Sequence, residues 1–162
     1  MNYRLPPSNN ADQILPNVWL GNLKAAHDET FLRNAGIQVV FNATKDALFH
    51  ASIRRRYRVP VDDNFQEEEI RNMELWSYET IYKLIKEYKE GRPILIHCYA
   101  GMQRSPAIVA MFLMALFRMS ADQAKAYIQN KRPIAFMPSA NFEASIRGFE
   151  RSLLKNLIEG IE

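Results

Sequence analysis

The sequence predicts an α/β fold in which a central mixed, mostly parallel sheet is flanked by helices. Short segments rich in branched and aromatic residues alternate along the chain with longer segments whose apolar residues recur at helical spacing. The chain has 162 residues, which suits one domain with a sizeable core, and no repeat or Gly/Ser linker divides it. We therefore expect a flexible tail over residues 1–12 and one folded domain over residues 13–158.

Four segments have the composition of β-strands. Residues 14–20 and 37–41 are short and rich in branched or aromatic side chains, and residues 57–61 have apolar side chains at alternate positions. Residues 93–97 are apolar on both faces, as in a strand covered by helices on both sides. We expect this last strand to be buried, and it leads directly into the only cysteine of the chain.

Four helices are expected between and after these strands. Gly91 and Pro93 end the first helix, and Pro106 suits the first turn of the second because that position needs no backbone donor. Ser120 with Gln123 three residues later forms a capping box for the third helix. The four helices are predicted over residues 66–88, 105–117, 120–130 and 142–157.

The composition favours a folded protein inside the cell. A single cysteine excludes an internal disulfide and favours a reducing compartment, either cytoplasm or nucleus. The start of the chain lacks the pattern of a signal peptide, and the longest apolar run, residues 106–117, is shorter than the roughly 20 residues of a membrane span. His27 and His50 lack metal-ligand spacing, so we expect no metal and no cofactor. We expect a monomer.

The segment from His97 to Ser105 has the order of an anion-binding loop at a helix N-terminus. A buried strand leads to Cys98, Gly101 relaxes the tightest curve of the backbone, and a helix begins at Ser105. Inward-facing amides and a helix dipole of roughly half a charge would hold phosphate above the sulfur. The candidate substrate-binding residues are Tyr99, Ala100, Gly101, Met102, Gln103 and Arg104.

Cys98 is the candidate nucleophile because positive charge around a thiol favours its reactive thiolate form. The Arg104 guanidinium can donate two parallel hydrogen bonds to phosphate oxygens, which a lysine could not do. Ser105 can donate a hydrogen bond to the sulfur when water later displaces it. For His97 two interpretations stay open: it packs at the strand end, or it orients the loop by hydrogen bonds.

Cleavage of a phosphate ester also needs a proton for the departing oxygen, and Asp62 and Asp63 are the candidates. Both follow the strand predicted over residues 57–61, on a loop that could fold over the phosphate. A positioned acid typically raises the rate by roughly 10²–10⁴-fold. The residues alone leave the choice between the two open.

The motif HCYAGMQRS, residues 97–105, resembles the signature of the dual-specificity branch of the cysteine-dependent protein tyrosine phosphatases: His-Cys, five residues, Arg, then Ser or Thr. The stretches ILPNVWLGNLKAA, GIQVVFNAT and VPVDDN are also similar to that family, so the resemblance spans about residues 13–154. It implies a catalytic domain that acts on phosphotyrosine and phosphoserine or phosphothreonine through a cysteinyl-phosphate. The implied roles are nucleophile Cys98, phosphate-binding Arg104, leaving-group helper Ser105 and general acid Asp63.

Two departures from the family pattern precede the last helix. Ser139 stands where the family has an asparagine, which puts the supporting hydrogen bonds of that position in question. The segment between Arg132 and Pro138 is slightly long, which leaves Arg132 as a candidate contact for a second phosphate. The densest basic cluster is either a solvated face or a contact for acidic flanks of a phosphopeptide; its members are Arg54, Arg55, Arg56 and Arg58.

Two alternative functions stay open. A related branch that removes RNA 5′-phosphates carries Thr-His after the cysteine, whereas this chain has Tyr99 and Ala100, so RNA is a less favoured partner despite a pI of about 9.0. A non-catalytic phospho-binding module would use the same loop, but this chain retains Cys98, Arg104 and an acid. The loop also lacks the lysines of the inositol-lipid branch. A phosphorylated protein is therefore the expected partner.

Overall fold

A five-stranded sheet runs through the structure, a computed structural model that describes residues 4–161. The strands are β1 (Ala11–Leu15), β2 (Val18–Gly21), β3 (Val39–Asn42), β4 (Arg55–Arg58) and β5 (Ile94–His97). They lie in the order β1-β2-β5-β3-β4, and every neighbouring pair is parallel except β1 with β2. The predicted mixed, mostly parallel sheet is therefore confirmed.

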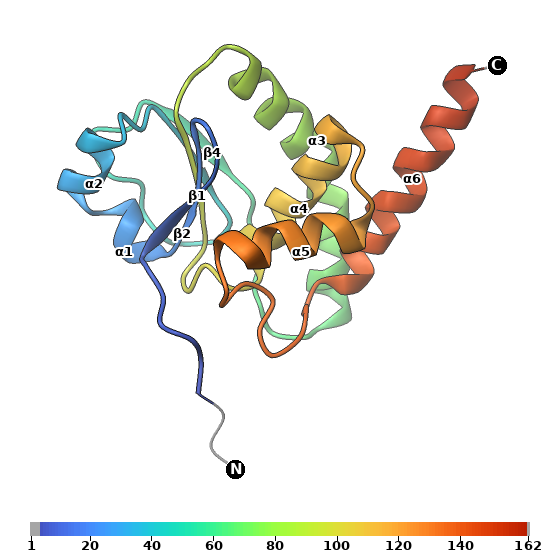
Figure 1. Cartoon of the computed structure of the whole chain (residues 1–162), viewed down its shortest axis with the longest axis horizontal. Coiled ribbons are helices and arrows are strands. Elements are labelled where there is room, and N and C mark those ends of the chain that lie inside the picture. Colours follow the sequence, from blue (N-terminus) through green and yellow to red (C-terminus); the bar gives the residue numbers. More distant parts are fainter. Residues whose placement is uncertain (1–3, 162) are drawn as a thin grey trace.

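Helices cover both faces of the sheet (Figure 1). One face carries the short helices α1 (Leu23–Ala26) and α2 (Glu29–Asn34). The other carries α3 (Glu67–Lys89), α4 (Arg104–Phe117), α5 (Ala121–Lys131) and α6 (Glu143–Ile161). Helix α4 is the centre of this second layer, because it contacts α3, α5 and α6 as well as β5. None of the helices within residues 4–161 has the length and apolar character that crossing a membrane requires.

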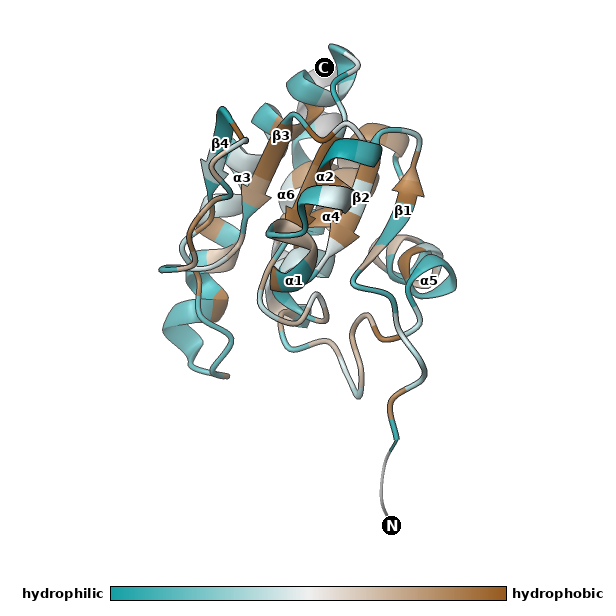
Figure 2. Cartoon of the chain, turned by 90° about the vertical axis from the view of Figure 1, so that its left-hand side faces the viewer, coloured by the Kyte–Doolittle hydropathy of each residue, from teal (hydrophilic) through white to brown (hydrophobic). Residues whose placement is uncertain are grey.

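The sheet separates two hydrophobic clusters. Ile94 and Ile96 of β5 belong to the larger cluster, which also contains Phe112 of α4. Leu95 points to the opposite face and packs in the smaller cluster with Leu32 of α2. Successive side chains of a strand alternate between faces, so a strand covered on both sides is apolar throughout. Figure 2 shows this contrast: the inner strands are hydrophobic, whereas β4 at the edge is largely hydrophilic.

The segment predicted as one strand over residues 14–20 is a hairpin, which corrects that prediction. Strands β1 and β2 pair antiparallel around a tight turn at Pro16 and Asn17, and Asn17 has a positive φ of 67°. Proline and asparagine are common turn residues, but the surrounding apolar run obscured this signal. Strand β1 begins at Ala11, two residues before the predicted start of the domain at residue 13. The flexibility of the tail stays a prediction.

Helices α1 and α2 were not predicted. They have four and six residues, which is too short for a helical period to show in the sequence. Each is capped by a side chain: Asn22 accepts from the Ala25 amide at 3.0 Å, and Asp28 accepts from the Phe31 amide at 3.1 Å. These two caps are local signals for the helices that connect β2 to β3.

Strand β4 covers an earlier segment than the strand predicted over residues 57–61, and it contains most of the basic cluster. Arg55 donates two hydrogen bonds to the buried Glu87 carboxylate, at 2.5 and 2.7 Å, which lowers the pKa of Glu87. Arg56 and Arg58 donate to backbone carbonyls of the preceding loop. These arginines hold the edge of the sheet together, which argues against a phosphopeptide contact.

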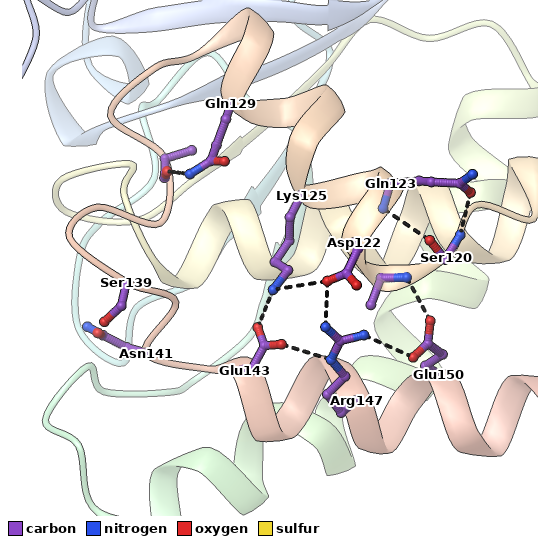
Figure 3. Close-up of polar contacts among 12 residues, drawn as sticks. Ser120, Asp122, Gln123, Lys125, Gln129, Ser139, Asn141, Glu143, Arg147 and Glu150 are labelled. Carbon is purple, nitrogen blue, oxygen red and sulfur yellow. Dashed lines mark hydrogen bonds and ion pairs between the residues drawn. The ribbon is translucent and has the colours of Figure 1, made fainter.

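A network of charged side chains joins α5 to α6 (Figure 3). Arg147 pairs with Asp122 at 2.5 Å, Glu143 at 2.8 Å and Glu150 at 3.3 Å. Lys125 pairs with Glu143 at 2.6 Å. The hydrogen bond from Arg147 lowers the pKa of Asp122. The network fixes the two helices on either side of the loop that connects them.

Candidate active site

The loop predicted to bind phosphate, residues 98–104 and called the phosphate loop for that reason, connects the end of β5 to the start of α4. Strand β5 lies between β2 and β3 and is parallel to both, so three strand ends meet around Cys98. Asn22 follows β2, and Asn42 ends β3. Ligands of open α/β sheets bind at the carboxyl ends of the strands, which is where the loop lies. The predicted order of strand, cysteine, loop and helix is therefore confirmed.

The sulfur of Cys98 is surrounded by hydrogen-bond donors. The residue is only 2% exposed, and its Sγ accepts a hydrogen bond from the Gly101 amide at 3.3 Å. Ser105 Oγ lies 3.2 Å from the same sulfur. The N-terminus of α4 adds partial positive charge to these contacts. A backbone amide, a hydroxyl and a helix N-terminus therefore converge on the sulfur.

The carbonyl groups of the phosphate loop point away from the sulfur. Four consecutive carbonyls, from Tyr99 to Met102, accept hydrogen bonds from groups outside the loop. The donors are the amides of Leu23 and Phe136 and the guanidinium of Arg132, at 2.7 to 3.4 Å. In a planar trans peptide the N–H points opposite to the C=O. The four amides that follow these carbonyls therefore face the sulfur side, where an anion would lie.

Arg132 lies behind the phosphate loop, so its predicted contact with a second phosphate is wrong. Its side chain is fully buried, and its Nε donates to the Gly101 carbonyl at 2.8 Å. Its Nη1 donates to the Asp12 carboxylate and to the Asn9 carbonyl, each at 2.8 Å. Gly101 has a φ of +66°, and a Cβ there would meet the Arg132 Nη2 at 2.7 Å. Glycine is required because the Gly21 carbonyl oxygen, at 2.6 Å from that Cβ position, and the guanidinium both approach the loop closely and because φ is positive.

The Arg104 guanidinium is held in place by a backbone carbonyl and an aromatic ring. Its Nη1 donates to the Val61 carbonyl at 3.0 Å, and its Cζ lies 5.3 Å from the centre of the Tyr99 ring. Its buried Nε has no hydrogen-bond partner among residues 4–161. An unpaired buried donor of a charged group is costly. The orphan donor indicates that an acceptor, such as a phosphate oxygen, belongs beside it.

His97 contacts the loop through one ring nitrogen. Its Nδ1 lies 3.2 Å from the Cys98 carbonyl, and its Nε2 has no partner among the described residues. Burial lowers the pKa of His97 to about 4, so the ring is neutral at pH 7. A neutral ring whose Nδ1–H donates to that carbonyl fixes the backbone at the nucleophile. This contact favours the orienting interpretation of His97 over packing alone.

The two candidate acids have different surroundings. Asp62 lies 3.2 Å from Lys45, and its backbone amide donates to Glu69 at 2.7 Å. Burial alone would raise the pKa of Glu69, but hydrogen bonds from Lys45 and the Asp62 amide outweigh it and lower that pKa. Asp63 is exposed and accepts a hydrogen bond from the Asn141 side chain at 2.9 Å. Asp62 therefore anchors the loop, which leaves Asp63 better placed to serve a substrate.

The remaining predicted substrate-binding side chains divide between the mouth and the wall of the site. Tyr99 is 43% exposed, and its hydroxyl donates to the Asp46 carboxylate, which raises the pKa of Tyr99. The Gln103 side chain is buried and donates to the carbonyls of Met137 and Ser139 at 3.0 and 2.9 Å. The Gln103 side chain therefore binds a neighbouring loop, and a contact of Gln103 with substrate through its backbone amide stays a prediction.

Sequence reasoning missed three residues that reach the site from other segments. Lys45 and Asp46 follow β3, which is parallel to β5. Because ligands bind where parallel strands end, their position after β3 could have predicted that they lie near the site. Asn141 lies two positions beyond Ser139, the residue that departs from the family pattern. An asparagine two positions after the one in the family pattern was the sign in the sequence that Asn141 contacts Asp63.

The fold and the site define a class of protein. The central strand β5 leads into Cys98, and the loop that follows has inward-facing amides and Arg104. This arrangement suits a tetrahedral anion, as in the cysteine-dependent phosphatases. A family model described as the catalytic domain of dual specificity phosphatases matches residues 18–152. The chain belongs to this family.

Known relatives agree with this assignment. The chain is 30% identical over 154 residues to tyrosine-protein phosphatase vhp-1 of Caenorhabditis elegans, covering 93% of the chain and 23% of that protein. It is 30% identical to human dual specificity protein phosphatase 8, covering 91% of the chain and 23% of the relative. The chain thus spans about a quarter of the length of these relatives. A mouse putative dual specificity phosphatase complexed with zinc tungstate superimposes with a TM-score of 0.79 at 25% identity, covering 98% and 96% of the two chains.

Proposed function

We propose that this domain hydrolyses phosphotyrosine and phosphoserine or phosphothreonine in proteins through a cysteinyl-phosphate intermediate. Membership of the dual specificity phosphatase family supports the reaction class. The observation that carries the proposal is the pairing of two features: Cys98 Sγ under the inward Gly101 amide, and the buried Arg104 Nε that has no partner among the described residues. Tungstate is a tetrahedral oxyanion like phosphate, and the similar mouse structure is a complex with it.

In the first half-reaction the Cys98 thiolate attacks phosphorus, and the bond from phosphorus to the substrate oxygen breaks. Asp63 gives its proton to that oxygen, which leaves as the hydroxyl of the protein side chain. The inward amides and Arg104 bind the three other oxygens, where the negative charge of the transferring group is spread. The products of this step are the dephosphorylated side chain and phosphate bound to Cys98.

In the second half-reaction water attacks the same phosphorus and gives a proton to the Asp63 carboxylate. The sulfur–phosphorus bond breaks, its electron pair returns to Cys98, and inorganic phosphate leaves. The Ser105 hydroxyl, 3.2 Å from the sulfur, stabilises the departing thiolate by a hydrogen bond. Asp63 is then protonated again and the domain is ready for another cycle.

The test is hydrolysis of aryl phosphates and of a phosphopeptide panel that includes phosphotyrosine, phosphoserine and phosphothreonine. We expect wild type to release phosphate and Cys98→Ser to release none while still binding phosphopeptide. Asp63→Ala should slow turnover by roughly 10²-fold or more, and Asp62→Ala should slow it less. A wild type that binds phosphopeptides without hydrolysing them would instead be a binding module. Release of phosphate from a 5′-triphosphorylated RNA alone would replace the protein substrate by RNA.

A further inference from the structure

The Asn141 side chain contacts the proposed acid directly. Its Nδ2 donates a hydrogen bond to Asp63 Oδ1 at 2.9 Å, although the two residues are 78 positions apart in sequence. Asp63 is exposed, and its own loop offers no comparable contact for its carboxylate in the described residues. An exposed carboxylate samples several rotamers unless a neighbour holds it. The amide of Asn141 holds this one without adding charge.

Asn141 is itself fixed to the phosphate loop. Its backbone amide donates to Gln103 Oε1 at 2.9 Å, and Gln103 Nε2 donates to the carbonyls of Met137 and Ser139. The next residue, Phe142, is buried in the large hydrophobic cluster. Ser139 and Asn141 lie together on the loop that leads into α6 (Figure 3). One buried glutamine of the phosphate loop therefore sets the position of the asparagine that touches the acid.

We propose that Asn141 is a positioning residue for proton donation by Asp63, and that Gln103 transmits the geometry of the phosphate loop to it. This inference rests on the proposed phosphatase function. The chain of contacts runs from Gln103 through the Asn141 backbone to the Asn141 side chain and then to Asp63. Proton donation depends on the distance between the acid and the leaving oxygen. If Asn141 no longer holds Asp63, we therefore expect only the protonation of the leaving group to become slower.

The distinguishing prediction concerns the leaving group. An acidic phenol such as 4-nitrophenol departs without help, whereas phenol needs a proton as it leaves. Asn141→Ala should slow hydrolysis of phenyl phosphate by up to about tenfold, since it removes the hydrogen bond that holds the Asp63 carboxyl, and slow 4-nitrophenyl phosphate less than twofold. In the Asp63→Ala background the Asn141 substitution should have no further effect on either substrate.

Matched variants keep the test decisive. Asn141→Leu removes the donor but keeps the branched shape of the side chain, so it should reproduce Asn141→Ala if the lost hydrogen bond is the cause. Asn130→Ala, on the exposed end of α5, should match wild type. Gln103→Met should show the same dependence on the leaving group as Asn141→Ala. Thermal unfolding of each variant verifies that it is folded.

The inference is overturned if Asn141→Ala slows both esters equally, if it slows neither, or if it still slows phenyl phosphate in the absence of the Asp63 carboxylate. Failure of the proposed function gives a different result: wild type and Cys98→Ser would be indistinguishable, with no phosphate released from any ester.

Discussion

The Arg132 guanidinium binds the Gly101 carbonyl from behind the phosphate loop at 2.8 Å. The same guanidinium also binds Asp12 of β1. The end of α5, strand β1 and the phosphate loop therefore meet at the buried Arg132 side chain. A carbonyl drawn toward Arg132 turns the following amide toward the sulfur. The side chain that looked suited to a second phosphate therefore orients the binding of the first.

Replacing Arg132 tests this arrangement. Arg132→Met leaves the partly buried Asp12 without its charged partner and the Gly101 and Asn9 carbonyls without their donor, so it should lower the free energy of unfolding by about 2–4 kcal/mol. Arg132→Lys keeps the charge but cannot bind Gly101, Asn9 and Asp12 together, so it should fold and bind vanadate at least about tenfold more weakly. Vanadate inhibition and chemical denaturation measure the two effects. Arg151→Lys, on the exposed face of α6, is the control; a normal vanadate affinity in Arg132→Lys would contradict the orienting role.

Gly101 should tolerate no side chain. A Cβ at this position would lie 2.6 Å from the Gly21 carbonyl oxygen, which is backbone and cannot move aside, and φ is +66°. We expect Gly101→Ala to destabilise the domain by about 3 kcal/mol or more and to lower activity by roughly 10²-fold. Gly91→Ala is the matched control, since φ is +78° but no atom lies within 4 Å, so it should cost about 1–2 kcal/mol and leave activity unchanged. Equal effects of the two substitutions would refute the steric argument.

Gly148 of α6 lies directly against the Glu74 side chain of α3. A Cβ there would lie 1.7 Å from Glu74 Oε1, and Glu74 also accepts a hydrogen bond from Tyr78 at 3.1 Å. Gly148→Ala should therefore destabilise the wild type by about 1–3 kcal/mol. In a Glu74→Ala background the same change should stabilise by about 1 kcal/mol, because only helix propensity remains. Chemical denaturation of the four proteins of this cycle measures the coupling, and a stabilising effect in wild type would show that Glu74 moves freely.

The buried His97 predicts a loss of stability in weak acid. Burial lowers the pKa of His97 from 6.5 to about 4, so the unfolded chain takes up a proton that the folded domain excludes. The corresponding stability is complete above pH 6.5 and is lost as the pH falls toward 4, by on the order of 3 kcal/mol. Denaturation of wild type and His97→Gln at pH 7 and pH 4.5 tests this. The variant should lack most of the decrease, whereas His50→Gln should retain it.

Periodic and motif-bearing segments were predictable from the sequence. Residues 66–88 correspond to α3 within one residue at each end, and the capping box of Ser120 and Gln123 is present as expected. Cys98, Gly101 and Ser105 meet because they lie close together in one short segment from the loop into the first turn of α4, so their order in the chain was sufficient.

Contacts between distant segments were not predictable. Pairing of Asn141 with Asp63, or of Tyr99 with Asp46, depends on where α6 begins and where β3 ends in space, which no local pattern encodes. The arginines show the same limit, because the sequence does not reveal whether a given arginine, such as Arg132, is buried or exposed in the fold. The Pro16–Asn17 turn was missed for another reason: apolar residues on both sides concealed a short hairpin.

The position of β5 has one more consequence. This strand is hydrogen-bonded along both edges and covered on both faces, so the segment that leads into Cys98 is enclosed on every side. Amide hydrogens of such a strand exchange with solvent only when the whole domain opens. Heat inactivation should then coincide with global melting, without an earlier stage in which the catalytic machinery alone comes apart.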